Sequence, residues 1–184
     1  MRAGVFRIRF WGVRGSYPAP GPRTAGVGGN SSCVEIATDE HALVFDAGTG
    51  IIQLGRALVQ RPGKPVVHIF LSHLHHDHIE GLRFFAPAYS PEWKCNVYGA
   101  NSTTPSLKTL LAQTMTPRFF PVSLSQLPAR ISIRSLGKHD PAMESDDVVA
   151  EVQEVSPELE AKGVRLASLA ALAVVIGIGL NVRP

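Results

Sequence analysis

Four histidines and one aspartate crowd into six positions, 73–78, of the decapeptide SHLHHDHIEG, in a chain that has only seven histidines. Neutral imidazoles bind zinc, manganese and iron well, and a carboxylate suits the same ions. A single histidine is usually an ordinary polar residue, but such a cluster beside a loop has few explanations other than metal binding. The decapeptide therefore predicts a site for a divalent metal, zinc in first place and manganese or iron as alternatives.

The spacing within the decapeptide divides these ligands into two pairs. In an extended or tightly turning loop, His73 and His75 project to the same side. Asp77 and His78 follow on a turn into a helix, where they can face a second ion, whereas His76 points away. The sequence therefore predicts a site for up to two ions.

The other histidines carry weaker signals. His41 lies in a predicted turn and His68 inside a predicted buried strand, so both are interpreted as ordinary residues. His139, in the stretch GKHDP, is a candidate extra ligand, although a polar HDP stretch is more often a solvated turn.

The metal motif must be positioned by the elements around it. VVHIFL, residues 66–71, is a continuous apolar run typical of a central strand buried on both faces, and the decapeptide begins where this strand ends. Mixed strands and helices predict an α/β sandwich with sheets inside and helices outside. The other predicted elements are strands at 6–10, 33–37, 42–45, 96–99, 131–136 and 148–155, and a helix from an N-cap at Thr104 through Met115. A further helix is predicted at 51–58, where the helical spacing of Ile51, Leu54 and Leu58 marks an apolar face.

Length and composition indicate one folded domain, residues 1–184. The chain is 45% hydrophobic and only 18% charged, which excludes a disordered protein. Its net charge is +3, but the lysines and arginines are scattered and form no nucleic-acid-binding arm. An anionic substrate would suit this charge balance.

Two cysteines and one apolar stretch bear on the cellular setting. Cys33 and Cys95 form neither a CxxC pair nor a disulfide framework, so a reduced, cytoplasmic location is expected. Residues 166–180 carry no charge but are shorter than the ~20 residues that span a bilayer. Buried secondary structure is therefore favoured over membrane contact there.

Several motifs carry a resemblance to a known family. HLHHDH matches the HxHxDH motif of the metallo-β-lactamase superfamily, whose members are largely metal-dependent hydrolases. FWGVRGSYPAPG, GGNSSCVEI and VFDAGTGI, in this order, resemble the branch that contains phosphodiesterases and ribonuclease Z-like enzymes. The likeness covers about residues 5–122 and implies a metallo-β-lactamase-like αββα sandwich.

The resemblance also implies roles for particular residues. His73 and His75 would bind the first metal, and Asp77 and His78 the second, with Asp77 also the catalytic residue. Asp46 would lie beneath the site and orient a ligand; the alternative is an aspartate that merely caps a turn. The implied reaction is cleavage of a phosphodiester, in a nucleotide or nucleic acid, by a water activated between two ions.

The later part of the chain departs from the family pattern. In a tentative alignment, Ser156 and Gly179 occupy positions where the family has a histidine and an aspartate ligand. Residues 135–184 are therefore expected to be divergent or truncated, leaving the N-terminal half of the fold and an atypical tail. The alternative function is a degenerate remnant that binds metal weakly or acts as an interaction module. A homo-oligomer would be one way to bury the apolar tail.

Overall fold

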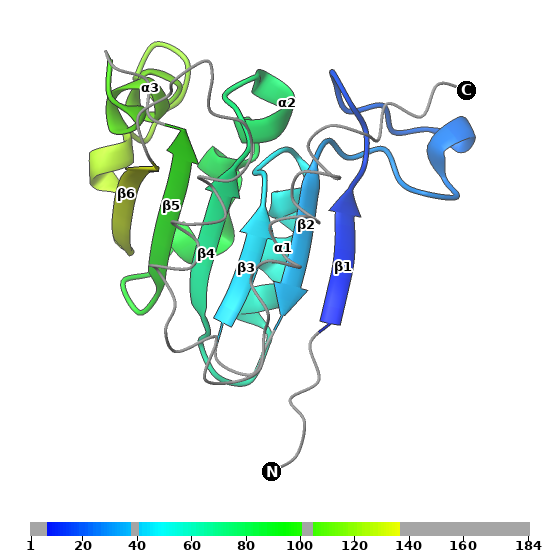
Figure 1. The fold of residues 1–184 in the computed structure, drawn as a ribbon, viewed down its shortest axis with the longest axis horizontal. Coiled ribbons are helices and arrows are strands. Elements are labelled where there is room, and N and C mark those ends of the chain that lie inside the picture. Colours follow the sequence, from blue (N-terminus) through cyan, green and yellow to red (C-terminus); the bar gives the residue numbers. More distant parts are fainter. Residues whose placement is uncertain (1–6, 38–40, 101–104, 137–184) are drawn as a thin grey trace.

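A single six-stranded sheet forms the centre of the protein in the computed structural model, which describes residues 7–37, 41–100 and 105–136 (Figure 1). Its strands are hydrogen-bonded in the order in which they occur along the chain. They are β1 (Arg7–Gly12), β2 (Cys33–Ala37), β3 (His41–Phe45), β4 (Val66–Leu71), β5 (Lys94–Ala100) and β6 (Arg130–Leu136).

The direction of the strands brings the metal motif to one edge of the sheet. β1, β2 and β3 are antiparallel neighbours, whereas β3, β4, β5 and β6 run parallel. The carboxyl ends of the parallel strands therefore meet at the same edge, where Phe45 pairs with Phe70 and Leu71 with Gly99. Both Asp46 and the decapeptide follow directly from these strand ends.

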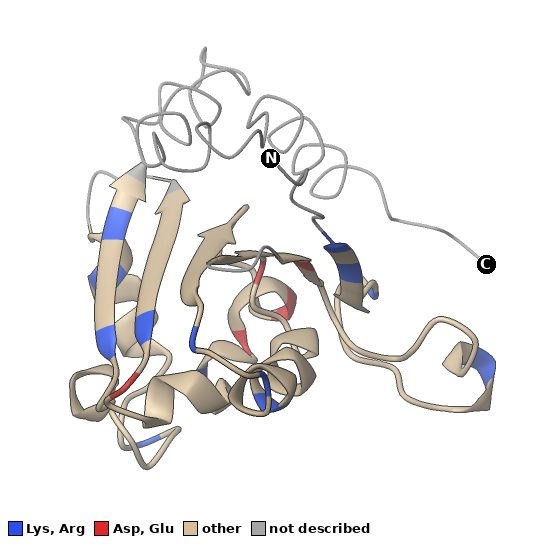
Figure 2. Cartoon of the chain, turned by 90° about the horizontal axis from the view of Figure 1, so that it is seen from below, with Lys and Arg blue, Asp and Glu red and all other residues tan. Residues whose placement is uncertain are grey.

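Helices cover one face of this sheet (Figure 2). α1 (Gly50–Val59) buries Ile51, Leu54 and Leu58 against it, the three residues whose helical spacing predicted the apolar face. The other helical segments are α2 (His76–Ile79), α3 (Leu107–Gln113) and the short 3-10 turns η1 (Pro22–Thr24), η2 (Leu82–Phe84), η3 (Ala86–Tyr89) and η4 (Leu124–Gln126).

The predicted α/β class is confirmed, and the described residues supply one helical layer and one sheet of the predicted αββα sandwich. The run VVHIFL forms β4 as predicted, with every residue after Val66 buried. Residues 148–155 and 166–180, predicted as a strand and as buried structure, lie outside the described residues. No helix in the described ranges is both long enough and apolar enough to cross a membrane.

Two local predictions are wrong. The helix predicted to begin at Thr104 has Ser106 as its N-cap, because the Ser106 hydroxyl accepts a hydrogen bond from the Thr109 amide and Pro105 stays outside the helix. His41, predicted in a turn, opens β3 and pairs with Val66, because β3 begins one residue earlier than its apolar run.

A buried ion pair fixes the start of the sheet against the end of α1. Glu35 of β2 is 1% exposed and accepts hydrogen bonds from both terminal nitrogens of Arg61, just beyond α1, and from the Trp11 indole 2.9 Å away. A carboxylate is buried in this way only when its charge and its lone pairs are satisfied.

The face of the parallel strands that points away from α1 carries a row of aromatic and histidine rings. Phe45, Phe70 and Tyr98 stack across β3, β4 and β5 with centroids 5.5 and 4.8 Å apart. His68 lies next to Tyr98, with its Nδ1 3.3 Å from the tyrosine hydroxyl and its Nε2 3.3 Å from Nδ1 of His41. Burial lowers the pKa of His68 to about 4, and the charges of His41 and Lys94 add to this effect.

Candidate metal centre

The loop after β3 holds the metal motif through backbone contacts. The Ala47 amide donates to the His78 carbonyl at 2.7 Å, and the Gly81 amide donates to the Ala47 carbonyl at 2.9 Å. The loop after β3 and the α2 segment approach so closely that a Cβ on Gly48 would lie 2.2 Å from the Asp77 carbonyl oxygen. Glycine is therefore required at this position, and DAGTG and α2 pack as one unit.

Asp46 is the centre of a hydrogen-bond network beneath the motif. Its carboxylate is buried, with 2% of the residue exposed, and its backbone adopts a left-handed conformation with φ of 64°. The carboxylate accepts hydrogen bonds from the Ser72 amide at 2.9 Å, the Ser72 hydroxyl at 2.8 Å and the Ser32 hydroxyl at 3.1 Å. It also lies 2.7 Å from Nδ1 of His78. Asp46 therefore orients the His78 ring, as well as the start of the motif.

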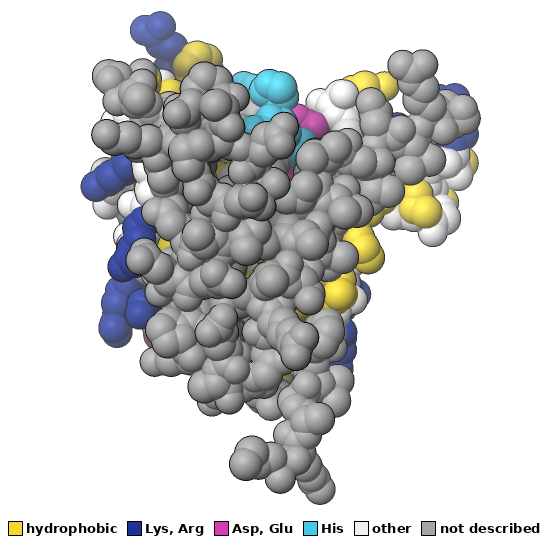
Figure 3. Space-filling view, in the orientation of Figure 1, with side chains coloured by type: hydrophobic (Ala, Val, Ile, Leu, Met, Phe, Trp, Pro, Cys, Tyr) yellow, Lys and Arg dark blue, Asp and Glu magenta, His cyan; other side chains and the backbone are white. Residues whose placement is uncertain are grey.

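Three motif histidines form one cluster above Asp46. The His73 ring lies between the other two, with its centroid 4.5 Å from that of His75 and 4.0 Å from that of His78. Figure 3 shows histidine and acidic side chains together at the end of the molecule where α2 lies. Rings this close bring three imidazole donors to one small region of the surface.

Asp77 lies beside this cluster and is held from a second direction. Its Oδ2 is 3.4 Å from Nε2 of His78, and the residue is 8% exposed. The same oxygen accepts a 2.7 Å hydrogen bond from the backbone amide of Ser16, in the long loop after β1. Ser16 has φ of 70°, a left-handed conformation that is uncommon for a serine. The loop after β1 therefore contributes to positioning the aspartate.

The electrostatic environment differs between the neighbouring histidines. Burial lowers the pKa of His73, and the charges of His78 and His75 lower it further against the opposing charges of Asp46 and Asp77. Burial would also lower the pKa of His78, but its hydrogen bond to Asp46, together with the charges of Asp46 and Asp77, outweighs burial and raises it.

The donor set matches a borderline divalent ion in residue type. Imidazole nitrogens and carboxylate oxygens are the ligands that zinc, manganese and iron share. As the side chains lie, however, no group of three or more His, Cys, Asp or Glu residues in the described part of the chain is arranged to hold an ion. The donors are instead engaged with one another and with the protein: Nδ1 of His73 lies 3.0 Å from the Ser72 hydroxyl, and both nitrogens of His78 face carboxylates.

The structure brings together five of the six residues predicted for the site. These are His73, His75, Asp77, His78 and Asp46. The sixth, His139, and the late positions Ser156 and Gly179 lie outside the described residues. His76 lines a pocket on the other side of α2, and His41 and His68 belong to the row of rings on the sheet.

Sequence reasoning missed the three serines that hold the carboxylates, Ser16, Ser32 and Ser72. Ser72 directly follows β4 and Ser32 directly precedes β2, so both positions at strand ends next to the motif were a usable signal. Ser16 acts through its backbone amide, which no side-chain pattern can indicate.

Comparison with known proteins gives one family match. The family model described as the metallo-beta-lactamase superfamily matches residues 26–159. A comparison with curated proteins finds no match.

Two solved structures are similar to the chain at low sequence identity. The metallo-beta-lactamase fold protein YhfI from Bacillus subtilis is 18% identical, with a TM-score of 0.44 over 72% of this chain and 47% of its own. A Thermotoga maritima protein described as a candidate metallo-beta-lactamase is 13% identical, with a TM-score of 0.39 over 76% of this chain and 62% of its own. The chain thus spans about half the length of the first structure and less than two thirds of the second.

Proposed function

Because the chain belongs to the metallo-β-lactamase superfamily, we propose that it is a metal-dependent hydrolase that cleaves a phosphodiester. The superfamily as a whole implies binding of divalent metal and hydrolytic chemistry. The phosphodiester substrate and the link to the phosphodiesterase and ribonuclease Z-like branch are the proposed refinements. The proposed ligands are His73, His75, Asp77 and His78.

The contact between Asp46 and His78 is the observation that carries this proposal. An aspartate that only capped its own turn would accept hydrogen bonds from backbone amides about one to three residues away. Asp46 instead reaches Nδ1 of a histidine 32 residues later, at 2.7 Å, while it is buried. A carboxylate on one ring nitrogen fixes the ring and leaves Nε2 as the ligand atom, the arrangement that metal-binding histidines use.

The chain's own residues would supply binding and orientation. His73 and His75 extend from the loop after β4, and Asp77 in the adjoining helix α2 is held in place by the Ser16 amide. A bound divalent metal would supply Lewis acidity and a water of lowered pKa. The roles of Asp46 and Ser16 are to keep His78 and Asp77 oriented while substrate binds.

A second candidate function is a non-catalytic domain that binds one ion weakly or contacts another protein. The observation in its favour is that the donors, as they lie in the described residues, are not arranged to hold an ion. The family positions at Ser156 and Gly179 carry no metal ligand in the tentative alignment, which points the same way.

The two functions are separated by metal content and turnover. The purified full chain, supplied with zinc, manganese or iron, is expected to retain at least one equivalent of metal, and His73→Ala combined with His75→Ala to retain none. His76→Ala, which removes a neighbouring histidine from the pocket side of α2, should retain the metal. Metal-free wild-type protein that is fully folded would overturn the proposed site.

Hydrolysis is measured on bis(p-nitrophenyl) phosphate, a generic phosphodiester. The metal-loaded chain is expected to release nitrophenol, and Asp77→Ala to lose this activity. Metal binding without hydrolysis of this substrate would instead support the non-catalytic domain.

A further inference from the structure

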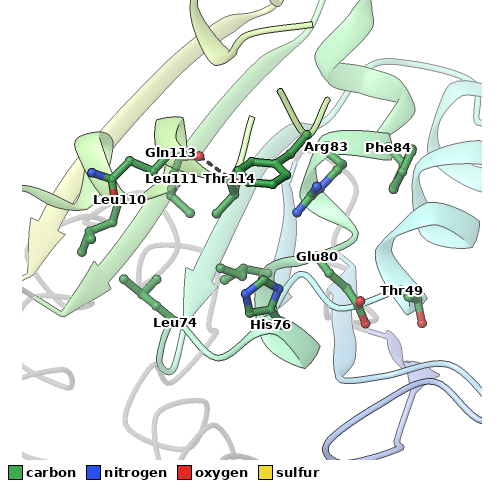
Figure 4. A pocket seen from close by; sticks show the side chains of 12 residues that line it. Thr49, Leu74, His76, Glu80, Arg83, Phe84, Leu110, Leu111, Gln113 and Thr114 are labelled. Atoms are coloured by element: carbon green, nitrogen blue, oxygen red, sulfur yellow. Dashed lines mark hydrogen bonds between the residues drawn. The ribbon is translucent and has the colours of Figure 1, made fainter. Parts of the chain in front are cut away.

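A pocket of about 730 Å³ lies beside the candidate metal centre (Figure 4). α2 forms the wall that separates the two. Asp77 and His78 of this helix take part in the histidine cluster, whereas His76 and Glu80, one turn apart, line the pocket. The far wall comes from α3 and the residues after it, including Leu110 and Phe119. A ligand held in this pocket would lie across α2 from the proposed metal ligands.

Among the described residues that line this pocket, Arg83 is the permanent cation. Arg83 follows α2, and Figure 4 shows its side chain reaching toward the same space as the His76 ring. None of the ion pairs among the described residues involves Arg83, and its guanidinium carbon lies 5.8 Å from the centre of the Phe120 ring. Glu80 is the acidic residue of the lining, and one of its carboxylate oxygens accepts a 3.1 Å hydrogen bond from the Ser31 hydroxyl. The pocket therefore offers an arginine to an anionic group.

Two phenylalanines line the same pocket yet remain in contact with solvent. Phe119 is 74% exposed and Phe84 is 51% exposed, although Phe84 also packs edge-on against Phe120 at 5.3 Å. Exposed aromatic rings at the rim of a pocket are unfavourable in water, and they are the usual platform on which nucleobases stack. Arginine is the side chain best suited to a neighbouring phosphate.

We propose that this pocket binds one nucleoside phosphate unit of the substrate, with its base against Phe84 and Phe119 and its phosphate at Arg83. The inference rests on the proposed function, because it makes the pocket the substrate-binding part of the same site. It adds the place where a nucleoside phosphate would bind, a pocket whose phenylalanines favour a phosphodiester with an aromatic nucleobase over one whose ester groups are aliphatic.

Equilibrium binding tests the pocket without relying on turnover. Adenosine 5′-monophosphate, adenosine and ribose 5-phosphate are titrated by calorimetry into the purified full chain, both with its metal and with a chelator present. The monophosphate is expected to bind at least tenfold more tightly than either fragment under both conditions. A preference seen only with metal present would place the phosphate on the metal and overturn the assignment of Arg83.

Two variants locate this preference, and two matched variants control for it. Arg83→Gln should abolish the preference for the monophosphate over adenosine, and Phe119→Ala the preference over ribose 5-phosphate. Arg130→Gln and Phe10→Ala change an arginine and an exposed phenylalanine on the edge strands and should leave both preferences intact. Equal affinities for the three ligands, or preferences that survive in both pocket variants, would overturn the proposal; circular dichroism confirms that each variant is folded.

The experiments distinguish a failure of the proposed hydrolase function from a failure of the proposed nucleotide pocket. Hydrolysis of bis(p-nitrophenyl) phosphate without a preference for the monophosphate would retain the hydrolase and reject the nucleotide pocket. Tight, Arg83-dependent binding of the monophosphate without hydrolysis would retain the pocket and reject the hydrolase.

Discussion

The Asp46 carboxylate lies 2.7 Å from Nδ1 of His78, although Asp46 follows β3 and His78 lies in α2, after β4. The same carboxylate accepts hydrogen bonds from the amide and the hydroxyl of Ser72, at the start of the motif. One buried side chain thus orients the first residue of the decapeptide and one of its histidines, His78. The register of β3 and β4 brings Asp46 close to the start of the decapeptide, because Phe45, the last residue of β3, pairs directly with Phe70 of β4.

Replacing Asp46 should weaken metal binding. Asp46→Asn keeps the size of the side chain but removes the negative charge and one acceptor oxygen, so His78 loses its orientation. We expect affinity for zinc to fall by about 10- to 100-fold, the usual effect of losing the group that supports a histidine ligand. Competition with a chromogenic chelator measures this affinity. Glu92→Gln, an exposed acid on the opposite end of the sheet, is the control, and equal affinities in the two variants would contradict the role of Asp46.

Gly48→Ala should destabilise the fold at the metal motif. The new Cβ would lie 2.2 Å from the Asp77 carbonyl oxygen and 2.5 Å from the Ser31 hydroxyl, so α2 must shift. Overpacking of this kind costs about 1–3 kcal/mol of unfolding free energy. Urea denaturation measures the loss. Gly26→Ala introduces the same methyl group where no atom lies within 4 Å, and an equal loss there would show that the close approach is unimportant.

Arg61→Ala should cost more stability than loss of an exposed lysine. It leaves the buried carboxylate of Glu35 without its charged partner, with only the Trp11 indole still donating. Because Arg61 itself is partly exposed, we expect about 3 kcal/mol, the lower end of the range for breaking a buried pair. Lys64→Ala breaks the exposed pair with Glu92 and should cost under about 1 kcal/mol.

A double variant provides the check on this interpretation. Glu35→Gln combined with Arg61→Ala should recover part of the loss, because no buried charge is then left unpaired. A double variant less stable than Arg61→Ala alone would mean that Arg61 acts through packing.

The free energy of unfolding should decrease as the pH falls below about 6.5, because His68 stays neutral in the folded protein down to a pH of about 4. Burial lowers its pKa to about 4 in the folded protein, whereas the unfolded chain takes up a proton near the ordinary value of about 6.5. Between these two values the unfolded state binds more protons, so the free energy of unfolding decreases as pH decreases, by about 3 kcal/mol in all.

His68→Gln should remove this part of the pH dependence. His41, Tyr98 and Lys94 lie around His68 and contribute to its environment, so the informative quantity is the difference between the wild type and the variant. Guanidinium denaturation at pH 7 and at pH 5 measures it. Identical losses of stability in the two proteins would contradict the buried, neutral state of His68.

Periodicity and chemistry predicted most of the described scaffold and the clustering of the motif histidines. VVHIFL indicated a central strand because it has no polar face to expose, and the spacing of Ile51, Leu54 and Leu58 indicated the helix that packs on the sheet. The start of α3 was predicted wrongly, because Thr104 and Ser106 are both good N-cap residues on either side of Pro105, and the sequence alone does not show which hydroxyl accepts a backbone amide of the first turn.

Contacts made by the backbone or by distant residues could not be predicted. The Ser16 amide reaches Asp77 across 61 positions, and its side chain gives no sign of it. The pocket likewise combines Arg83 with Phe119, which come together only through the placement of α3 beside α2. Local patterns specify elements and ligand types, whereas long-range placement decides what lies beside them.

The consecutive strand order has a consequence for how the protein folds. Because each described strand pairs with the next one along the chain, no pairing passes over an intervening strand, and a sheet of this order can grow one strand at a time. Asp46, Ser72, Asp77 and His78 all precede Gly81, and so do the serines that hold them. The residues of the histidine cluster and of the Asp46 network are therefore synthesised before the segment that builds the far wall of the pocket.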